Sequence, residues 1–125
     1  MFSHIMVGTN DLDRAKAFYD PVFGALGVEP ASIDGGRIFY RTPTGVFAVT
    51  KPINGEPATV ANGATIGFSC SSPEQADAWH AAGLANGGTA CEDPPGVREN
   101  PAMKLYLAYM RDPDGNKLCA LYWMS

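Results

Sequence analysis

The sequence predicts an α+β fold in which one strand–helix–strand–strand–strand unit occurs twice within a single domain, residues 1–125. Two segments align without a gap at a constant spacing of 61 residues. Each holds a strand-like apolar run followed by a helix-like pattern, and each is followed by further strand-like runs joined by polar turns. A repeat present only twice indicates paired supersecondary units, because a solenoid needs three or more.

The aligned segments begin at His4 (HIMVGTNDLDRAKAFYDPVFGALG) and at Thr65 (TIGFSCSSPEQADAWHAAGLANGG). Few positions are identical, but apolar residues fall on apolar residues and turn residues on turn residues. We therefore divide the chain into a first module, residues 1–60, and a second module, residues 61–125. Pro52–Gly63 (PINGEPATVANG) has the composition of a linker between them.

The first module opens with a strand at Ser3–Val7, and Asp11 is positioned to cap the helix that follows. Proline inside a helix removes a hydrogen bond, so we expect a break at Pro21 and a short second turn through Leu26. Gly27 then ends the helical region. Three strand-like runs follow, near Ile33, at Arg37–Arg41 and at Val46–Thr50.

The second module repeats this order. A strand at Ala64–Ser69 leads to Ser72, which is a helix cap, with Pro73 at the first helical position and Gln75 available to complete a capping box. Gly87-Gly88 ends the helix. Strand-like runs follow near Ala90, at Lys104–Met110 and at Lys117–Trp123, the last two joined by the turn RDPDG.

Charge and composition exclude several classes of partner. The net charge is -4 and no basic cluster is present, so binding to nucleic acid or to an anionic membrane is disfavoured. No signal peptide and no stretch of membrane-spanning length is visible. Cys70, Cys91 and Cys119 form an odd, widely spaced set, which argues against a disulfide framework and suits a cytoplasmic protein.

Two motifs and the opening histidine indicate a family. His4 on the first strand, NDLDRAKAFYDPVFGALGVE and YMRDPDGNKLCALYW together resemble the vicinal oxygen chelate superfamily, which includes glyoxalases, extradiol dioxygenases, fosfomycin-resistance enzymes and bleomycin-binding proteins. The resemblance implies a glyoxalase-like fold: paired βαβββ modules whose mixed sheets curl into a cup that holds the ligand. It also implies that the protein is often a homodimer, and in the enzymes a divalent metal lies in the cup.

The resemblance places the family's metal-ligand positions on the first and last strands of each module. On the first strands they are His4 and Thr65, which the repeat pairs, and on the last strands they are Val49 and Cys119, when the turns PTGVFAV and PDGNKLC are aligned. Metal-binding members carry His, Gln or Glu there, and only His4 fits. Val49 cannot donate, a threonine hydroxyl is a poor ligand, and Cys119 could bind only as a thiolate. We therefore expect no cofactor; if a divalent metal does bind, His4 and Cys119 are its ligands.

Side chains alternate along a strand, so these four positions predict the other residues that line the cup. Cys119 itself could be a nucleophile, but we favour a small hydrophobe on a buried strand. Tyr19 and His80, on the helices, are expected to face solvent or a partner. The predicted lining is Met6, Gly67, Phe47, Leu121 and Trp123, and the resemblance adds Arg98 and Tyr106 as possible substrate contacts.

An apolar, aromatic cup favours a protein that binds a small apolar or aromatic molecule beside a degenerate metal site. The alternative is a metal-dependent enzyme of glyoxalase or dioxygenase type, acting as a lyase, isomerase or oxygenase, with an unusual ligand set. A third interpretation is a structural protein whose cup is filled by its own side chains. Because open sheet edges are covered most simply by a second copy, we also expect a homodimer.

Overall fold

A computed structural model describes residues 1–125 and confirms the predicted α+β fold. The first module contains β1 (His4–Gly8), α1 (Leu12–Gly24), β2 (Ile33–Asp34), β3 (Arg37–Thr42) and β4 (Gly45–Thr50). The second contains β5 (Ile66–Ser69), α2 (Pro73–Ala85), β6 (Thr89–Ala90), β7 (Gly96–Asn100), β8 (Met103–Arg111) and β9 (Lys117–Trp123). Both helices start and both end 61 residues apart, as the aligned repeat predicts.

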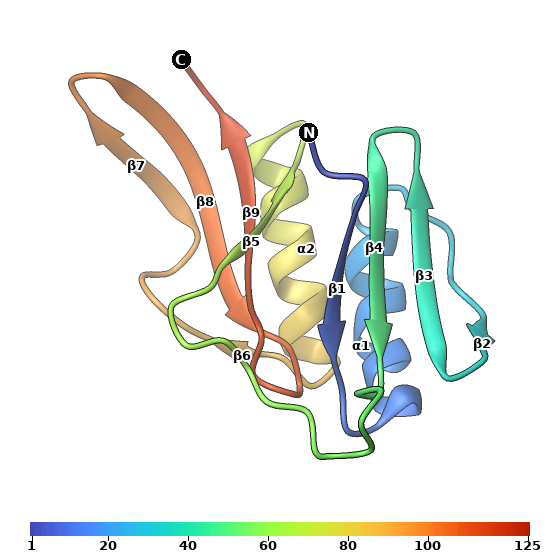
Figure 1. Cartoon of the computed structure of the whole chain (residues 1–125). Helices are drawn as coiled ribbons and strands as arrows, with labels where there is room; N and C mark the ends of the chain where they lie inside the picture. The colour runs from blue at the N-terminus through green and yellow to red at the C-terminus, as the bar shows by residue number, and fades with distance from the viewer.

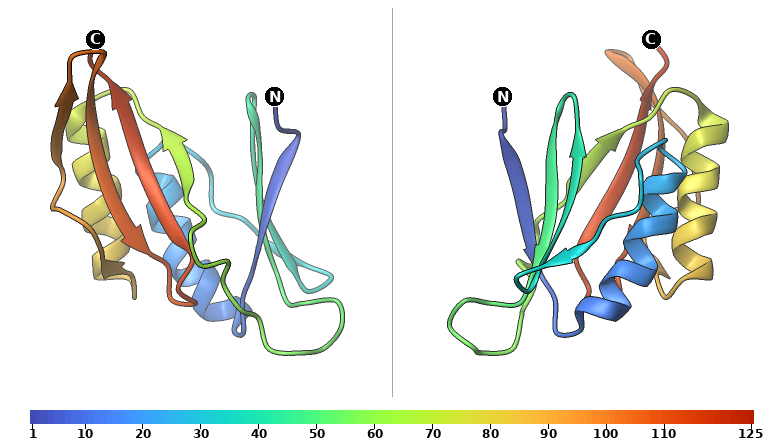
Figure 2. Two further views of the ribbon diagram at one scale, coloured as in Figure 1. Left: turned by 60° about the vertical axis from the view of Figure 1, so that its left-hand side comes forward. Right: turned by 90° about the vertical axis from the view of Figure 1, so that its right-hand side faces the viewer.

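Each module forms its own mixed sheet (Figure 1). The first has the order β1-β4-β3-β2, and the second has the order β5-β9-β8-β6 with β7 also paired to β8. In both sheets the first strand runs parallel to the last strand, and the hairpins are antiparallel. No strand pairing joins β1 to β5, and the sheets diverge toward the end where both termini lie (Figure 2). The homodimer stays a prediction.

The hydrophobic core lies between the sheets and the two helices, which pack against each other on the same side of the sheets (Figures 1 and 2). Its largest fully buried side chains include Trp79, Tyr19, Tyr40 and Phe18. The expectation that Tyr19 faces solvent or a partner is therefore wrong, because Tyr19 lies in the core. His80 is half-buried, with Nε2 3.1 Å from the carbonyl oxygen of Tyr109. Both residues lie on helix faces that contact a neighbouring element, and periodicity within one helix does not reveal that contact.

The polar turn between β8 and β9 is buried because it binds the first module. Asp112, 3% exposed, accepts a hydrogen bond from the Tyr19 hydroxyl at 2.5 Å. It also accepts from the backbone N–H groups of Asp114 and Asn116 and from the Asn116 side-chain amide, at 2.8–2.9 Å. The Asn116 amide nitrogen reaches the Gly8 carbonyl at the end of β1 as well, at 3.2 Å.

Asp114 makes a second set of bonds across the same junction. Its carboxylate accepts from the Thr9 hydroxyl at 2.5 Å, from the Asn10 N–H at 3.0 Å and from the Arg14 guanidinium at 2.9 Å. All three donors belong to the connection between β1 and α1 or to the first turn of α1. The aspartates of the turn therefore join the modules through hydrogen bonds, in addition to the shared apolar core.

Both predicted helix caps are confirmed. The Asp11 side chain accepts from the Arg14 N–H at 3.0 Å, and the Ser72 hydroxyl accepts from the Gln75 N–H at 3.1 Å. The Gln75 side chain binds the N–H of Ser71 at 2.6 Å, one residue before the expected partner. No helix is long and apolar enough to cross a membrane.

Two expectations about the elements were wrong. The first helix is not broken at Pro21 but continues to Gly24, because Val22 and Phe23 are buried in the core and hold the last turn in place. The expected helical turn through Leu26 is a hydrogen-bonded turn that follows this helix. Strand β7 was not expected, since its sequence, GVREN, is polar and lies between prolines. It pairs along its whole length with β8.

Candidate functional site

The register of the strands decides which side chains share a face of the first sheet. Ile5, Phe47 and Tyr40 are cross-strand neighbours on β1, β4 and β3, and all three face the helices. The next row, His4, Val46 and Arg41, therefore faces the opposite, open side. Together the two rows bring both aromatic and cationic side chains to the end of the sheet near the N-terminus.

This register corrects two residues of the predicted site. Val49 is fully buried and Phe47 is 5% exposed, and both belong to the core cluster between sheet and helices. Alternation counted from Val49 predicted that both side chains would lie on the open face beside His4, but neither does. Phe47 does reach a cavity, but from the face that the helices cover.

The reason is a difference in loop length. The β3–β4 loop has two residues and the β8–β9 loop has five, so aligning the two turns does not align the strands that follow. By strand register Met6 pairs with Ala48, and Gly67 pairs with Cys119. Ala48, rather than Val49, is thus the counterpart of Cys119. A shift of one residue moves a whole strand's side chains to the other face.

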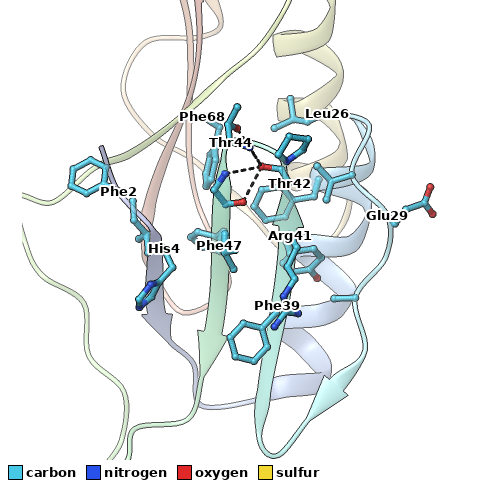
Figure 3. A pocket seen from close by; sticks show the side chains of 18 of the residues that line it. Phe2, His4, Leu26, Glu29, Phe39, Arg41, Thr42, Thr44, Phe47 and Phe68 are labelled. Carbon is cyan, nitrogen blue, oxygen red and sulfur yellow. Dashed lines mark hydrogen bonds between the residues drawn. The ribbon is translucent and has the colours of Figure 1, made fainter.

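The sheets diverge at one end of the molecule (Figure 2), and the main cavity, of about 1030 Å³, lies at that end (Figure 3). Its walls come from the N-terminal residues, β1, the β3–β4 hairpin, the loop after α1 and β5. Of the predicted site residues, His4, Phe47 and Gly67 line it. A volume of about 300–1,000 Å³ is typical of sites for small organic molecules, so the space admits such a ligand.

Three phenylalanines form the floor of this cavity. Phe23 of α1, Phe47 of β4 and Phe68 of β5 lie with ring centroids 5.2–5.3 Å apart, and Phe68 meets the other two edge to face. The cluster draws one residue from each of three elements and spans both modules. Phe23 and Phe47 are 3% and 5% exposed, so the half-buried Phe68 offers a ligand most of the aromatic contact area, and the other two rings support it.

Tyr40 lines the cavity too, but its polar group is already engaged. Its hydroxyl donates to Asp20 at 2.7 Å. Burial, followed by this bond to a carboxylate, raises the pKa of Tyr40 far above its ordinary value. Burial also raises the pKa of Asp20, but hydrogen bonds from Lys16 and Tyr40 outweigh it and the net shift is downward. Tyr40 is therefore a neutral structural residue at neutral pH, not a proton-transfer group.

Cys119 lies on β9 with 4% of its surface exposed, and its thiol is 3.5 Å from the carbonyl oxygen of Ala120. Burial raises the pKa of Cys119 to about 11. The thiol is thus protonated at neutral pH, which supports the small-hydrophobe interpretation, because the thiolate is the reactive form. Leu121 and Trp123 follow on the same face of β9, with Trp123 57% exposed, and neither lines the main cavity.

The remaining predicted residues lie apart from it. Tyr106 faces the helices, and its hydroxyl donates to Asp77 of α2 at 2.7 Å. Arg98 lies on β7 and binds two carbonyl oxygens of the preceding loop at 3.1 Å. Thr65 is exposed just before β5, and Met6 lines a separate cavity of about 270 Å³ beneath the linker.

The donor set does not fit a divalent metal. No group of three or more His, Cys, Asp or Glu side chains comes together anywhere in the structure. Of the four positions that the resemblance implied, His4 alone offers an accessible ligand of a usual kind, because the exposed Thr65 has only a neutral hydroxyl, Cys119 is buried and protonated, and Val49 lies in the core. A divalent ion needs about three protein donors in such a site.

Sequence analysis missed Phe39 and Arg41, which line the cavity from β3. The signal was present in RIFYRT, where Ile38 and Tyr40 are buried and their neighbours are not. Pairing this run with β4 through the two-residue turn would have placed Arg41 in the row of His4. The loop after α1 also lines the cavity, but no pattern in its sequence indicated this.

Comparisons with known proteins agree with the fold. Residues 1–120 match the family described as the Glyoxalase/Bleomycin resistance protein/Dioxygenase superfamily. A crystal structure of a glyoxalase/bleomycin resistance protein from Albidiferax ferrireducens T118 is 61% identical, with a TM-score of 0.95 and 98% of both chains covered. No functionally curated protein matches the chain.

Two more distant structures share the fold alone. A lactoylglutathione lyase from Agrobacterium tumefaciens is 23% identical, with a TM-score of 0.66, covering 98% of this chain and 92% of that one. A putative glyoxalase from Bacillus halodurans is 19% identical, with a TM-score of 0.77, covering 98% and 95%.

Proposed function

The chain belongs to the glyoxalase/bleomycin resistance protein/dioxygenase superfamily, and on that basis we propose that it binds a small apolar or aromatic molecule in the cavity floored by Phe23, Phe47 and Phe68. The aromatic floor is the observation that carries this proposal. It provides contact area at the point where the two modules meet, and the cavity remains open above it. Shape and apolar contact then supply most of the affinity.

Gly67 offers a direct test of where the ligand lies. It lines the cavity from β5, its φ is not in the left-handed region, and a side chain added there meets no atom within 4 Å. Gly67→Leu should therefore fold normally and fill part of the cavity. We expect affinity for an aromatic probe to fall by about tenfold or more, since a loss of about 1.4 kcal/mol corresponds to a factor of ten.

Calorimetric titration with naphthalene derivatives measures this effect, and thermal unfolding verifies the fold. Gly24→Leu is the matched control, because Gly24 at the end of α1 is also surrounded by open space but does not line the cavity. Equal affinity in wild type and Gly67→Leu, at equal stability, would place the ligand elsewhere, and no binding to the wild-type protein would contradict the proposed function.

We further propose that binding requires no resident metal. The protein purified without added metal should contain far less than one equivalent of zinc, nickel, iron or manganese by elemental analysis, because His4 is the only accessible donor at the implied site. About one metal per chain, lost in His4→Ala, would contradict this proposal and favour the metal-dependent enzyme.

A further inference from the structure

Strand β5 has one edge without a partner strand. It pairs with β9 on one side only, and no strand pairing joins it to β1 across the gap between the sheets. All of its residues, Ile66–Ser69, line the main cavity. Because β9 covers the other edge, the cavity meets β5 at its free edge, where backbone hydrogen-bonding groups are left for a ligand.

The ladder with β9 shows which backbone groups face this free edge. The Cys70 N–H donates to the Leu121 carbonyl at 2.9 Å, and Ser69 is the register partner of Leu121. In a parallel pair this pattern directs the N–H and C=O groups of Phe68 and Cys70 toward β9. The direction of these groups alternates along a strand, so the N–H and C=O groups of Gly67 and Ser69 face the cavity.

The aromatic floor of the cavity lies one residue away from these groups. Phe68 follows Gly67, precedes Ser69 and packs on the helix-covered face. Its ring meets those of Phe23 and Phe47 edge to face, at centroid distances of 5.2–5.3 Å. Residues directly opposite each other in neighbouring strands have their side chains on the same face of the sheet. A ligand residue opposite Phe68 would therefore direct its side chain to the face of the phenylalanine floor.

The edge of β1 across the gap is less available. By the same ladder pattern the Gly8 carbonyl faces the gap, and the Asn116 side-chain amide already donates to it at 3.2 Å. Linker residues 59–61 line the smaller cavity together with Gly8 and Ile66, so the linker crosses the gap at this end. A short extended segment that enters through the main cavity suits this space better than the sheet edge of a second copy.

We infer that the ligand is an extended peptide segment with an aromatic side chain: its backbone pairs antiparallel with Gly67 and Ser69, and the aromatic side chain opposite Phe68 enters the cavity. The inference rests on the proposed function, since it specifies the class of molecule that binds in the same cavity. Recognition by strand addition draws affinity from main-chain hydrogen bonds and specificity from alternate side chains. Antiparallel pairing follows because it is slightly more stable per residue than parallel pairing.

Three blocked tripeptides test the inference by calorimetric titration of the wild-type protein. They are acetyl-Ala-Phe-Ala-amide, which should bind, and its derivatives N-methylated at the second alanine or at the phenylalanine. In the antiparallel register the N–H of the second alanine donates to the Gly67 carbonyl, whereas that of the phenylalanine points away from β5. Methylation at the alanine should therefore lower the affinity about tenfold. Methylation at the phenylalanine is the matched control and should leave it unchanged.

Ser69→Pro tests the same pairing from the side of the protein. Proline at this position removes the N–H that faces the cavity, and the ladder with β9 uses Phe68 and Cys70 instead, so the edge strand can accept it. Ser69→Ala is the matched control, because it removes the hydroxyl and keeps the N–H. We expect the affinity for the parent peptide to fall about tenfold in Ser69→Pro only. Both variants should keep the wild-type affinity for a naphthalene derivative, and thermal unfolding verifies their fold.

The outcomes separate this inference from the proposed function. Binding of the naphthalene derivative without the parent peptide would overturn the inference and leave the proposed function standing, whereas binding of neither would overturn both. Equal losses for the two methylated peptides, or an unchanged peptide affinity in a folded Ser69→Pro, would also overturn the inference. If a second copy occupies the edge instead, light scattering should show a wild-type dimer that Ser69→Pro converts into a monomer, and that result would overturn it as well.

Discussion

Replacing Asp112 with alanine is expected to lower the free energy of unfolding by about 3 kcal/mol or more, because it leaves several buried donors without an acceptor. Asp112 accepts from the Tyr19 hydroxyl, from two backbone N–H groups of its own turn and from the Asn116 amide. With this carboxylate 3% exposed, water cannot replace it without opening the junction between the modules. Urea unfolding followed by circular dichroism measures the loss.

A double-mutant cycle shows how much of this loss of stability comes from the hydrogen bond between Tyr19 and Asp112. Tyr19→Phe removes the hydroxyl group together with its hydrogen bond, so it should lower the free energy of unfolding less than Asp112→Ala does. In the double variant the loss should be smaller than the sum of the losses in the two single variants. Asp93→Ala is the control for removing an aspartate, since Asp93 is exposed and its carboxylate makes no hydrogen bond. Stability unchanged in Asp112→Ala would show that the turn does not join the modules energetically.

The sequence was sufficient for the elements whose signals are local. The helix caps at Asp11 and Ser72 depend on a side chain and the N–H three residues later, and both were predicted correctly. The spacing of 61 residues between the helices also held. Pro21 did not end its helix, because packing of the following residues outweighs a missing hydrogen bond, and packing is not a local property.

The site was predicted less well, since it depends on register. His4, Gly67 and Phe47 do line the cavity, but Phe47 was assigned to the wrong face by the one-residue shift that also misplaced Val49. The cavity itself depends on the gap between β1 and β5 and on the path of the loop after α1. Neither feature has a periodicity or spacing that a single sequence reveals.

The contacts between the two modules explain why an acidic turn and an aromatic cavity occur in one small chain. At one end of the molecule, Asp112 and Asp114 hold the modules together through buried hydrogen bonds. At the other end the sheets diverge; there the phenylalanine rings of the two modules meet, and the Gln75 amide donates to the Ala25 carbonyl at 3.2 Å. Fixing one end with directional bonds allows the other to stay open for a ligand without separating the modules.

Gly88→Ala is expected to lower the free energy of unfolding by about 2 kcal/mol, within the range of about 1–3 kcal/mol for overpacking a well-packed core. A Cβ at this position would lie 2.8 Å from the carbonyl oxygen of Gly83 and 2.7 Å from the Phe18 ring. The Gly88 N–H already donates to that carbonyl at 2.8 Å, so the backbone cannot move away without breaking the bond. Phe18 is fully buried and has no room to yield.

Gly24→Ala separates this clash from the general effect of adding a methyl group to a glycine. Gly24 is the last residue of α1, and a Cβ there meets no atom within 4 Å, so the change should be neutral or stabilising by up to about 1 kcal/mol through reduced chain entropy. Urea unfolding of both variants gives the comparison. Equal stability of Gly88→Ala and wild type would mean that the Phe18 ring and the last turn of α2 can both move away from the added methyl group at no cost.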